Sequence, residues 1–127
     1  MQRYSTIEMT EIRGNKCVFS KLIANGRCYF DEFEEQVNKN NDFGGEYEKI
    51  LTLMDLYANG TRLPSTKFNN IKDGKYHGVF WEFKTKHLRV YTVCKGKGQV
   101  VVIGGTKNSQ KKDIERFKKI SIEFISK

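Results

Sequence analysis

The alternation of apolar and polar residues predicts two short strands at the start of the chain. Residues 5–13 alternate in part, with Ile7 and Met9 set between polar residues, which is typical of a half-buried strand. Residues 17–23 are expected to form the returning strand after a turn, and the Asn-Gly pair at 25–26 marks a second turn. We therefore expect a β-hairpin before any helix.

The pattern changes to a helical period from residue 29 onward. Residues 29–40 repeat large apolar side chains at spacings of three and four. Their first turns are rich in acidic residues, which the helix dipole favours there. Residues 46–60 continue the same period and end at an Asn-Gly pair, a common helix stop. These two segments predict a helical hairpin.

The second half of the chain predicts consecutive strands and a closing helix. A linker at 61–70, which contains Pro64, comes first. Three apolar stretches are then expected to be strands joined by turns, namely residues 77–85, 87–94 and 99–105. An amphipathic helix follows, with Ser109 as its N-cap residue. The prediction is an α+β fold in one domain, residues 1–127, with the N-terminal helical hairpin packed on a twisted antiparallel sheet and a C-terminal helix.

Positive charge is concentrated in the second half of the chain. Residues 1–66 hold 8 Lys/Arg and 10 Asp/Glu, a net charge of −2, whereas residues 67–127 hold 15 Lys/Arg and 5 Asp/Glu, a net charge of +10. A segment this cationic attracts phosphate polyanions, because each neutralised phosphate releases condensed counterions. A solubilising coat of lysines is the alternative, although such a coat normally intersperses both signs.

Several classes of protein are disfavoured by the composition. No apolar run approaches the roughly 18 residues of a membrane span, and the first residues lack the apolar stretch of a signal peptide, so we expect a soluble, cytoplasmic protein. The three cysteines show no CxxC spacing and only two histidines accompany them, so neither a metal nor another cofactor is expected. The thiols are expected to be reduced and wholly or partly buried.

Motifs in the second half resemble those of a known toxin superfamily. An extended Leu-Pro linker and a "KDG" turn precede the strand "VFWEFKTK", the strand "LRVYTV" and the segment "VVVIGGTKNSQKKDIERF". This order is similar to that of the RelE/ParE toxin superfamily, most closely its HigB-like, phage-derived group, over about residues 60–120. The chain differs from the pattern of that group at Lys84, where the group has Arg, and at Thr106 and Asn108, where it has Phe and Lys.

The resemblance implies a RelE-like fold and a bacterial function. Members of the superfamily that cut messenger RNA direct the ribose 2′-OH at the adjacent phosphate without a metal. The expected function is therefore the toxin of a type II toxin–antitoxin system, an mRNA endonuclease (mRNA interferase) that acts on ribosome-bound message in the cytoplasm. Its expected protein partner is a cognate antitoxin, a small helix-turn-helix protein that covers the cationic surface.

The two central strands supply the candidate catalytic residues. Arg89 matches the family position and its guanidinium fits phosphate oxygens, so it is the candidate for charge stabilisation. Tyr91 and His87 are acid or base candidates. By strand parity, His87, Arg89 and Tyr91 share one face of the sheet. Whether Lys84 joins them to hold the RNA backbone depends on the strand register, which the sequence alone leaves open. The predicted RNA-binding residues are Lys86, Lys107, Lys111, Lys112, Arg116 and Trp81.

A second class of function stays open at this point. The same fold without nuclease activity would make the chain a ParE-like toxin that binds a protein target, or a degenerate phage-derived binding module. The departures from the pattern at Lys84 and Asn108 favour this alternative, while the +10 half favours RNA. Single residues also have simpler roles: Trp81 as a core residue, His87 as a solvent-exposed residue and Tyr91 as a tyrosine at the edge of the core.

Overall fold

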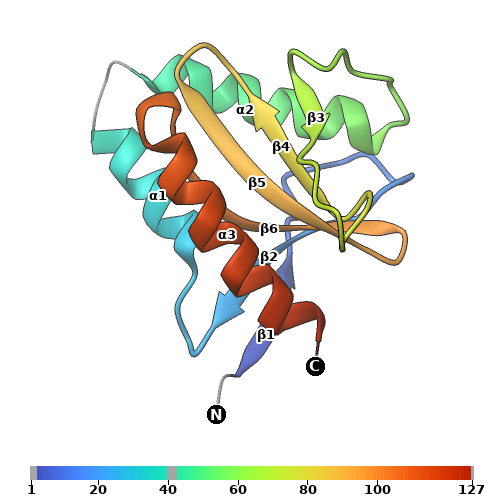
Figure 1. Ribbon diagram of the computed structural model, residues 1–127. Coiled ribbons are helices and arrows are strands. Elements are labelled where there is room, and N and C mark those ends of the chain that lie inside the picture. Colours follow the sequence, from blue (N-terminus) through green and yellow to red (C-terminus); the bar gives the residue numbers. More distant parts are fainter. Residues whose placement is uncertain (1–2, 40–42, 127) are drawn as a thin grey trace.

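The computed structural model describes residues 3–39 and 43–126 as a six-stranded sheet covered by helices (Figure 1). The strands are β1 (Tyr4–Glu8), β2 (Phe19–Ala24), β3 (Phe68–Asn70), β4 (Phe80–Lys84), β5 (Leu88–Lys95) and β6 (Gly98–Thr106). The helices are α1 (Tyr29–Lys39), α2 (Gly44–Ala58) and α3 (Gln110–Ile125), with a 3₁₀ turn, η2 (Lys107–Ser109), leading into α3. The predicted α+β class is confirmed.

The sheet is mixed rather than antiparallel. Its strand order is β1-β2-β6-β5-β4-β3, and the β2–β6 pair is parallel, with Phe19 opposite Gln99 and Lys21 opposite Val101. The predicted all-antiparallel sheet is therefore wrong at this pair. The reason is the path of the chain, which leaves β2 through α1 and α2 to the far edge of the sheet. The successive pairs from β3 to β6 then bring the last strand back beside β2 in the same direction.

Each face of the sheet is buried by different helices. α1 and α2 cover one face, where Phe19, Phe83 and Val90 belong to an apolar core shared with these helices. α3 crosses the other face, where Phe80 packs edge-on against Phe117 at 5.5 Å between ring centres. In Figure 1, α3 crosses in front of β6, and α2 passes behind β5 and β4. The sheet is thus the middle layer of three.

Two glycines near the end of β6 allow helices to approach both faces closely. A Cβ on Gly104 would lie 2.5 Å from the Phe33 ring of α1, and a Cβ on Gly105 would overlap the Asp113 carboxylate of α3. Because neither position leaves room for a side chain, Gly104 lets α1 lie close to one face, and Gly105 lets the first turns of α3 lie close to the other. The candidate site lies beside that contact.

The boundaries of the elements mostly agree with the expectations from the sequence. β3 is the main difference, because it lies inside the stretch predicted as a linker and pairs three residues with β4. The predicted first helix extends to residue 40, which is outside the described residues. Ser109 takes the N-cap position of α3, but its hydroxyl donates to Asp113 at 2.5 Å and makes no bond to a helix N–H. None of the described helices is long and apolar enough to cross a membrane.

Candidate functional site

The register of β4 and β5 brings four polar residues together on the face that α3 covers. Glu82 lies directly opposite Tyr91, and Lys84 lies directly opposite Arg89. Residues two apart on a strand point to the same face, so the four side chains form a two-by-two block. Asn69 of β3 extends the block, because it pairs with Glu82 from the other side. We call Asn69, Glu82, Lys84, Arg89 and Tyr91 the α3-face cluster.

The guanidinium of Arg89 is held in one orientation by the turn between β4 and β5. Its Nη1 donates to the carbonyl oxygen of Thr85 at 2.5 Å and to that of Leu88 at 2.8 Å. Only 8% of Arg89 is exposed, and its Nε is buried without a hydrogen-bond partner. The guanidinium is therefore fixed, charged and incompletely satisfied, which is unfavourable unless an acceptor is supplied.

Lys84 adds a second positive charge directly across the strand pair from Arg89. Like charges at directly opposed positions destabilise a sheet. Among the described residues, no carboxylate oxygen lies within 4.0 Å of the charged nitrogens of either side chain. Two neighbouring cations without a counter-ion form a site suited to an anion with several oxygens, such as a phosphate group.

Tyr91 belongs to the cluster but is buried beneath α3. It is fully buried, its ring stacks on Phe117 at 5.4 Å between ring centres, and its hydroxyl has no partner. Burial raises the pKa of Tyr91, and the nearby carboxylates of Glu82 and Asp113 raise it further, against an opposite effect of Arg89. The hydroxyl is therefore a weaker acid than an exposed tyrosine.

Glu82 and Asn69 complete the buried half of the cluster. Glu82 is 5% exposed and accepts a hydrogen bond from the Gln110 side chain of α3 at 3.1 Å. Asn69 uses its Nδ2 to donate to the carbonyl oxygen of Asn70 at 3.1 Å, which leaves its Oδ1 buried without a partner. Buried polar groups in folded proteins are nearly always hydrogen-bonded. Three residues of the cluster depart from that rule, which is more typical of a functional site than of a packed core.

Further lysines surround the end of the sheet where β4 ends and β5 begins. Lys107 in η2 donates its backbone N–H to the carbonyl oxygen of His87 at 2.8 Å, which ties the start of α3 to the β4–β5 turn. Lys111 is exposed and directly follows Gln110, the residue that contacts Glu82. Lys86 in the turn is exposed and lines a surface hollow with two further lysines, Lys49 and Lys67. The cluster thus lies at a strongly cationic end of the molecule.

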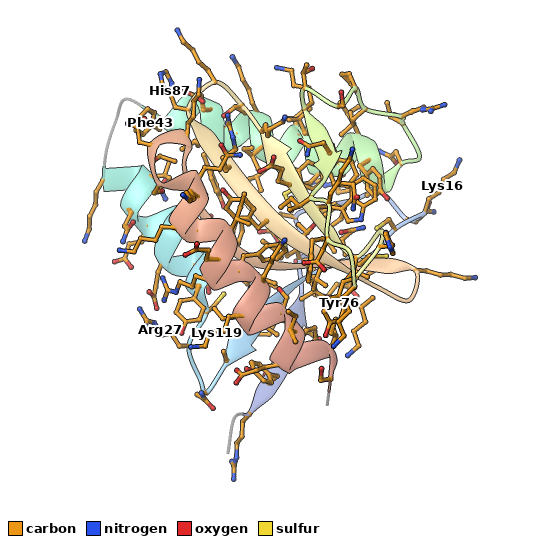
Figure 2. The ribbon with its side chains drawn as sticks, in the orientation of Figure 1. Lys16, Arg27, Phe43, Tyr76, His87 and Lys119 are labelled. Atoms are coloured by element: carbon orange, nitrogen blue, oxygen red, sulfur yellow. The ribbon has the colours of Figure 1, made fainter. Side chains whose placement is uncertain are left out.

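His87 does not share a face with Arg89 and Tyr91, contrary to the expectation from strand parity. It lies in the turn before β5, and its Nδ1 is 2.6 Å from a carboxylate oxygen of Glu46 in α2. Its ring lies beside Phe43, 5.2 Å away between ring centres (Figure 2). Parity fails here because a turn residue follows the hydrogen bonds of its turn rather than the alternation of a strand.

The other predicted RNA-binding residues lie away from the cluster. Trp81 is on the α1–α2 side of the sheet, where it stacks on Phe68 at 4.8 Å between ring centres. Arg116 places its guanidinium 4.4 Å from the ring centre of Tyr29, next to α1. Lys112 is exposed in the first turn of α3. In the described part of the structure, no hydrogen bond joins any of the three side chains to Lys84 or Arg89.

Glu46 at the start of α2 anchors the β4–β5 turn. One carboxylate oxygen accepts hydrogen bonds from the Thr85 hydroxyl at 2.6 Å and from the His87 backbone N–H at 2.7 Å. Burial raises the pKa of Glu46, but the hydrogen bonds from Thr85 and His87 outweigh it and lower that pKa to about 2. Thr85 in turn offers its carbonyl oxygen to Arg89, so α2 supports the orientation of the guanidinium through this turn.

Reasoning from the sequence missed three residues of this arrangement, namely Asn69, Glu82 and Glu46. Glu82 carried a usable signal, because a glutamate two residues before Lys84 in an otherwise aromatic strand must share the face of that lysine. Asn69 gave none, since it lay in a stretch read as a linker. Glu46 gave none either, because it is 41 residues from His87 in the chain.

Comparisons with known proteins add no assignment to this geometry. No protein-family model, curated protein or solved structure matches the chain. Across residues 3–39 and 43–126, no group of three or more His, Cys, Asp or Glu side chains is placed to hold a metal ion. Cys17 is buried, Cys28 and Cys94 are half-buried, and all three thiols are free. The α3-face cluster and its surrounding lysines are therefore the features that bear on function.

Proposed function

We propose that the protein binds single-stranded RNA at Lys84 and Arg89 and cleaves it as a metal-independent endonuclease, the toxin of a type II toxin–antitoxin system. The observation that carries the proposal is the fixed guanidinium of Arg89, which is buried with an unpartnered Nε directly opposite Lys84. A phosphodiester group has oxygens for both cations. The resemblance of the strand "LRVYTV" to the HigB-like group supports the same role for Arg89.

The two charges are suited to the chemistry of RNA cleavage. When the ribose 2′-OH attacks the adjacent phosphorus, extra negative charge develops on the phosphate oxygens before the 5′ oxygen leaves. Positive groups that are already in place stabilise this charge without having to reorganise during the reaction. Arg89 is held by two backbone carbonyl groups, and Lys84 faces the same position from the neighbouring strand. This mechanism needs no nucleophilic side chain, because the nucleophile belongs to the RNA.

The surrounding lysines favour an extended strand as the substrate. Lys86, Lys107 and Lys111 are exposed around the same end of the sheet, and such side chains bind a phosphate backbone without regard to sequence. We place the substrate on the ribosome, as translated messenger RNA. The partner that we propose is a small helix-turn-helix antitoxin that covers these lysines and thereby blocks the RNA.

Cleavage of a defined RNA by the purified protein tests this proposal. A synthetic message is incubated with the protein, with and without translating ribosomes, and the fragment ends are mapped and analysed for 2′,3′-cyclic phosphate. We expect the wild type to cleave and Arg89→Met to cleave at least about 100-fold more slowly, as for the loss of one preorganised charge-stabilising group. Intact RNA after incubation with the wild type under both conditions would overturn the endonuclease.

The control for this experiment is a lysine at the other end of the same strand. Lys97 is exposed in the turn between β5 and β6, so Lys97→Ala removes one positive charge without touching the cluster. We expect this variant to cleave like the wild type. A loss of cleavage in Lys97→Ala as large as in Arg89→Met would show that total charge, rather than the Lys84–Arg89 pair, determines the activity.

A second candidate is a protein of the same fold that binds without cutting. It is favoured by the placement of the predicted acid and base candidates, since the Tyr91 hydroxyl is buried and the His87 ring is bound to Glu46. RNA retention on a filter that weakens in Arg89→Met, together with intact RNA, would support a binding module. Neither retention nor cleavage would favour a ParE-like protein that acts on a protein target.

A further inference from the structure

The proposed phosphate site has a carboxylate beside it that no described cation neutralises. Glu82 is 5% exposed, and within the described part of the chain no Lys, Arg or His nitrogen lies within 4.0 Å of its oxygens. Its hydrogen bond comes from the neutral amide of Gln110 at 3.1 Å. Buried carboxylates are normally paired with a cation. Apart from that amide contact, the Glu82 carboxylate keeps lone pairs that can accept a further hydrogen bond.

Glu82 is a near neighbour of Lys84 and of Arg89 on the same face of the sheet. Lys84 follows it by two residues on β4, and Arg89 is its diagonal neighbour on β5. Residues two apart on a strand, and diagonal neighbours on adjacent strands, are separated by about 7 Å. Residues directly opposite each other, such as Lys84 and Arg89, are separated by about 5 Å. An RNA phosphate held between Lys84 and Arg89 therefore has its adjoining ribose within reach of the Glu82 carboxylate.

The other candidates for proton transfer are less suited to this position. Burial and the charges of Glu82 and Asp113 raise the pKa of Tyr91, so its hydroxyl stays protonated at neutral pH and has no free base to offer. The His87 ring is bound to Glu46 of α2 and packs against Phe43. Glu82 is the acceptor that the α3-face cluster itself contains.

We infer that Glu82 accepts the proton of the ribose 2′-OH, a catalytic role that rests on the proposed endonuclease function. The carboxylate takes this proton as the 2′ oxygen forms its bond to phosphorus, and the bond between phosphorus and the 5′ oxygen breaks. The Lys84 ammonium gives a proton to the leaving 5′ oxygen. The products are a 2′,3′-cyclic phosphate and a 5′-OH, and proton exchange with water restores the Glu82 carboxylate and the Lys84 ammonium.

The side-chain amide of Gln110 donates the hydrogen bond that the Glu82 carboxylate accepts in this structure. Gln110 is the first residue of α3 and is half-buried, so its side chain can turn away without breaking a helix hydrogen bond. The 2′-OH takes the place of this amide as the donor to Glu82. The start of α3 thus covers the acceptor until a hydroxyl group replaces the Gln110 contact.

The experiment compares Glu82→Gln with the wild type in the same cleavage assay. The glutamine keeps the size of the side chain and an oxygen that can accept from Gln110, but it cannot take a proton. We expect cleavage to fall about 100–10,000-fold while RNA retention stays within about twofold. Glu82→Asp should recover part of the rate.

The outcomes separate this role from the function on which it rests. Glu115→Gln, an equal change of charge at an exposed position of α3, is the control and should cleave normally. If Glu82→Gln cleaves within about fivefold of the wild type, Glu82 is not the acceptor, and the endonuclease stands. If the wild type does not cleave, both are overturned. Urea unfolding is measured alongside, and a joint loss of cleavage, RNA retention and stability in Glu82→Gln would make Glu82 a structural residue and overturn its catalytic role.

Discussion

The two faces of the sheet bury polar residues in different ways. On the α1–α2 side these groups are bonded: Glu46 accepts from Thr85 and His87, and Thr92 donates to Gln99 at 2.7 Å. On the α3 side, within the described residues, four side chains each have a buried atom without a partner: Asn69, Arg89, Tyr91 and Ser121. The strands are common to both faces, so backbone pairing is not the cause of the difference.

The two faces also differ in the kind of side chain that they bury. The α1–α2 side is a continuous apolar layer in which Phe19, Phe68 and Phe83 pack together, and burial of such side chains is the main source of stability. The α3 side places Lys84, Arg89 and Glu82 where apolar residues would stabilise the fold better. Polar groups kept at a cost in stability are more typical of a functional site than of a packed core.

Phe83→Ala should have the largest effect on stability, because it disrupts the apolar side. Phe83 is fully buried, and its ring centre lies 4.3 Å from that of Phe68 and 5.9 Å from that of Phe19. We expect the free energy of unfolding, measured by urea denaturation, to fall by about 3–5 kcal/mol. Arg89→Met is the matched change on the α3 side and should cost less than about 1 kcal/mol, because it removes a buried charge without a counter-ion. Equal losses from both variants would make the α3 side a second structural core.

Glu46 gives the stability of the bonded side a dependence on pH. Its pKa is lowered to about 2 in the folded protein, so its contribution to stability is complete above the ordinary carboxyl pKa and is lost as pH falls toward 2. At pH 6 we expect the free energy of unfolding of the wild type to be ~2 kcal/mol higher than that of Glu46→Gln. This amount is already reduced for the partial solvent exposure of the Glu46–His87 pair. At pH 2 we expect the two proteins to differ little. Urea unfolding of both proteins at the two pH values measures this. A difference that does not change with pH would contradict the role of the carboxylate charge.

Much of the fold could be predicted because its signals are local. The acidic first turn and the spacing of Phe30, Phe33 and Val37 predicted the helix that α1 forms, and these three side chains are its buried residues. The parallel β2–β6 pair could not be predicted, because it depends on which edge of the sheet the chain reaches after α2. β3 escaped prediction because its three residues gain their strand conformation from pairing with β4.

The sequence was enough to predict which charged residues belong to the site, but not how deeply they are buried. Parity placed Arg89 and Tyr91 on one face, but it is the register that sets Lys84 opposite Arg89. The burial of Tyr91 depends on how closely α3 approaches the sheet, and this depends on contacts far apart in the sequence, such as the Asp113 carboxylate above Gly105. Long-range contacts of this kind leave no local pattern.

The smallest effects come from a matched pair of buried tyrosines, one on each side of the sheet. The Tyr47 hydroxyl donates to Glu34 at 2.6 Å, whereas the Tyr91 hydroxyl has no partner. Tyr47→Phe should lower the free energy of unfolding by about 1 kcal/mol, because it removes a hydrogen bond. Tyr91→Phe should leave it unchanged or raise it by up to about 1 kcal/mol, because it removes an unsatisfied buried group.

Parallel urea titrations measure the pair, and the chemical change is the same in both, so effects on the unfolded chain cancel. A loss from Tyr91→Phe as large as that from Tyr47→Phe would mean that the Tyr91 hydroxyl is bonded in solution, which would remove the contrast between the two faces. If Glu82 is the proton acceptor, as we propose, Tyr91→Phe should also cleave RNA at the rate of the wild type. If Tyr91→Phe instead cleaves about 100-fold more slowly at unchanged stability, Tyr91 rather than Glu82 takes part in the proton transfer.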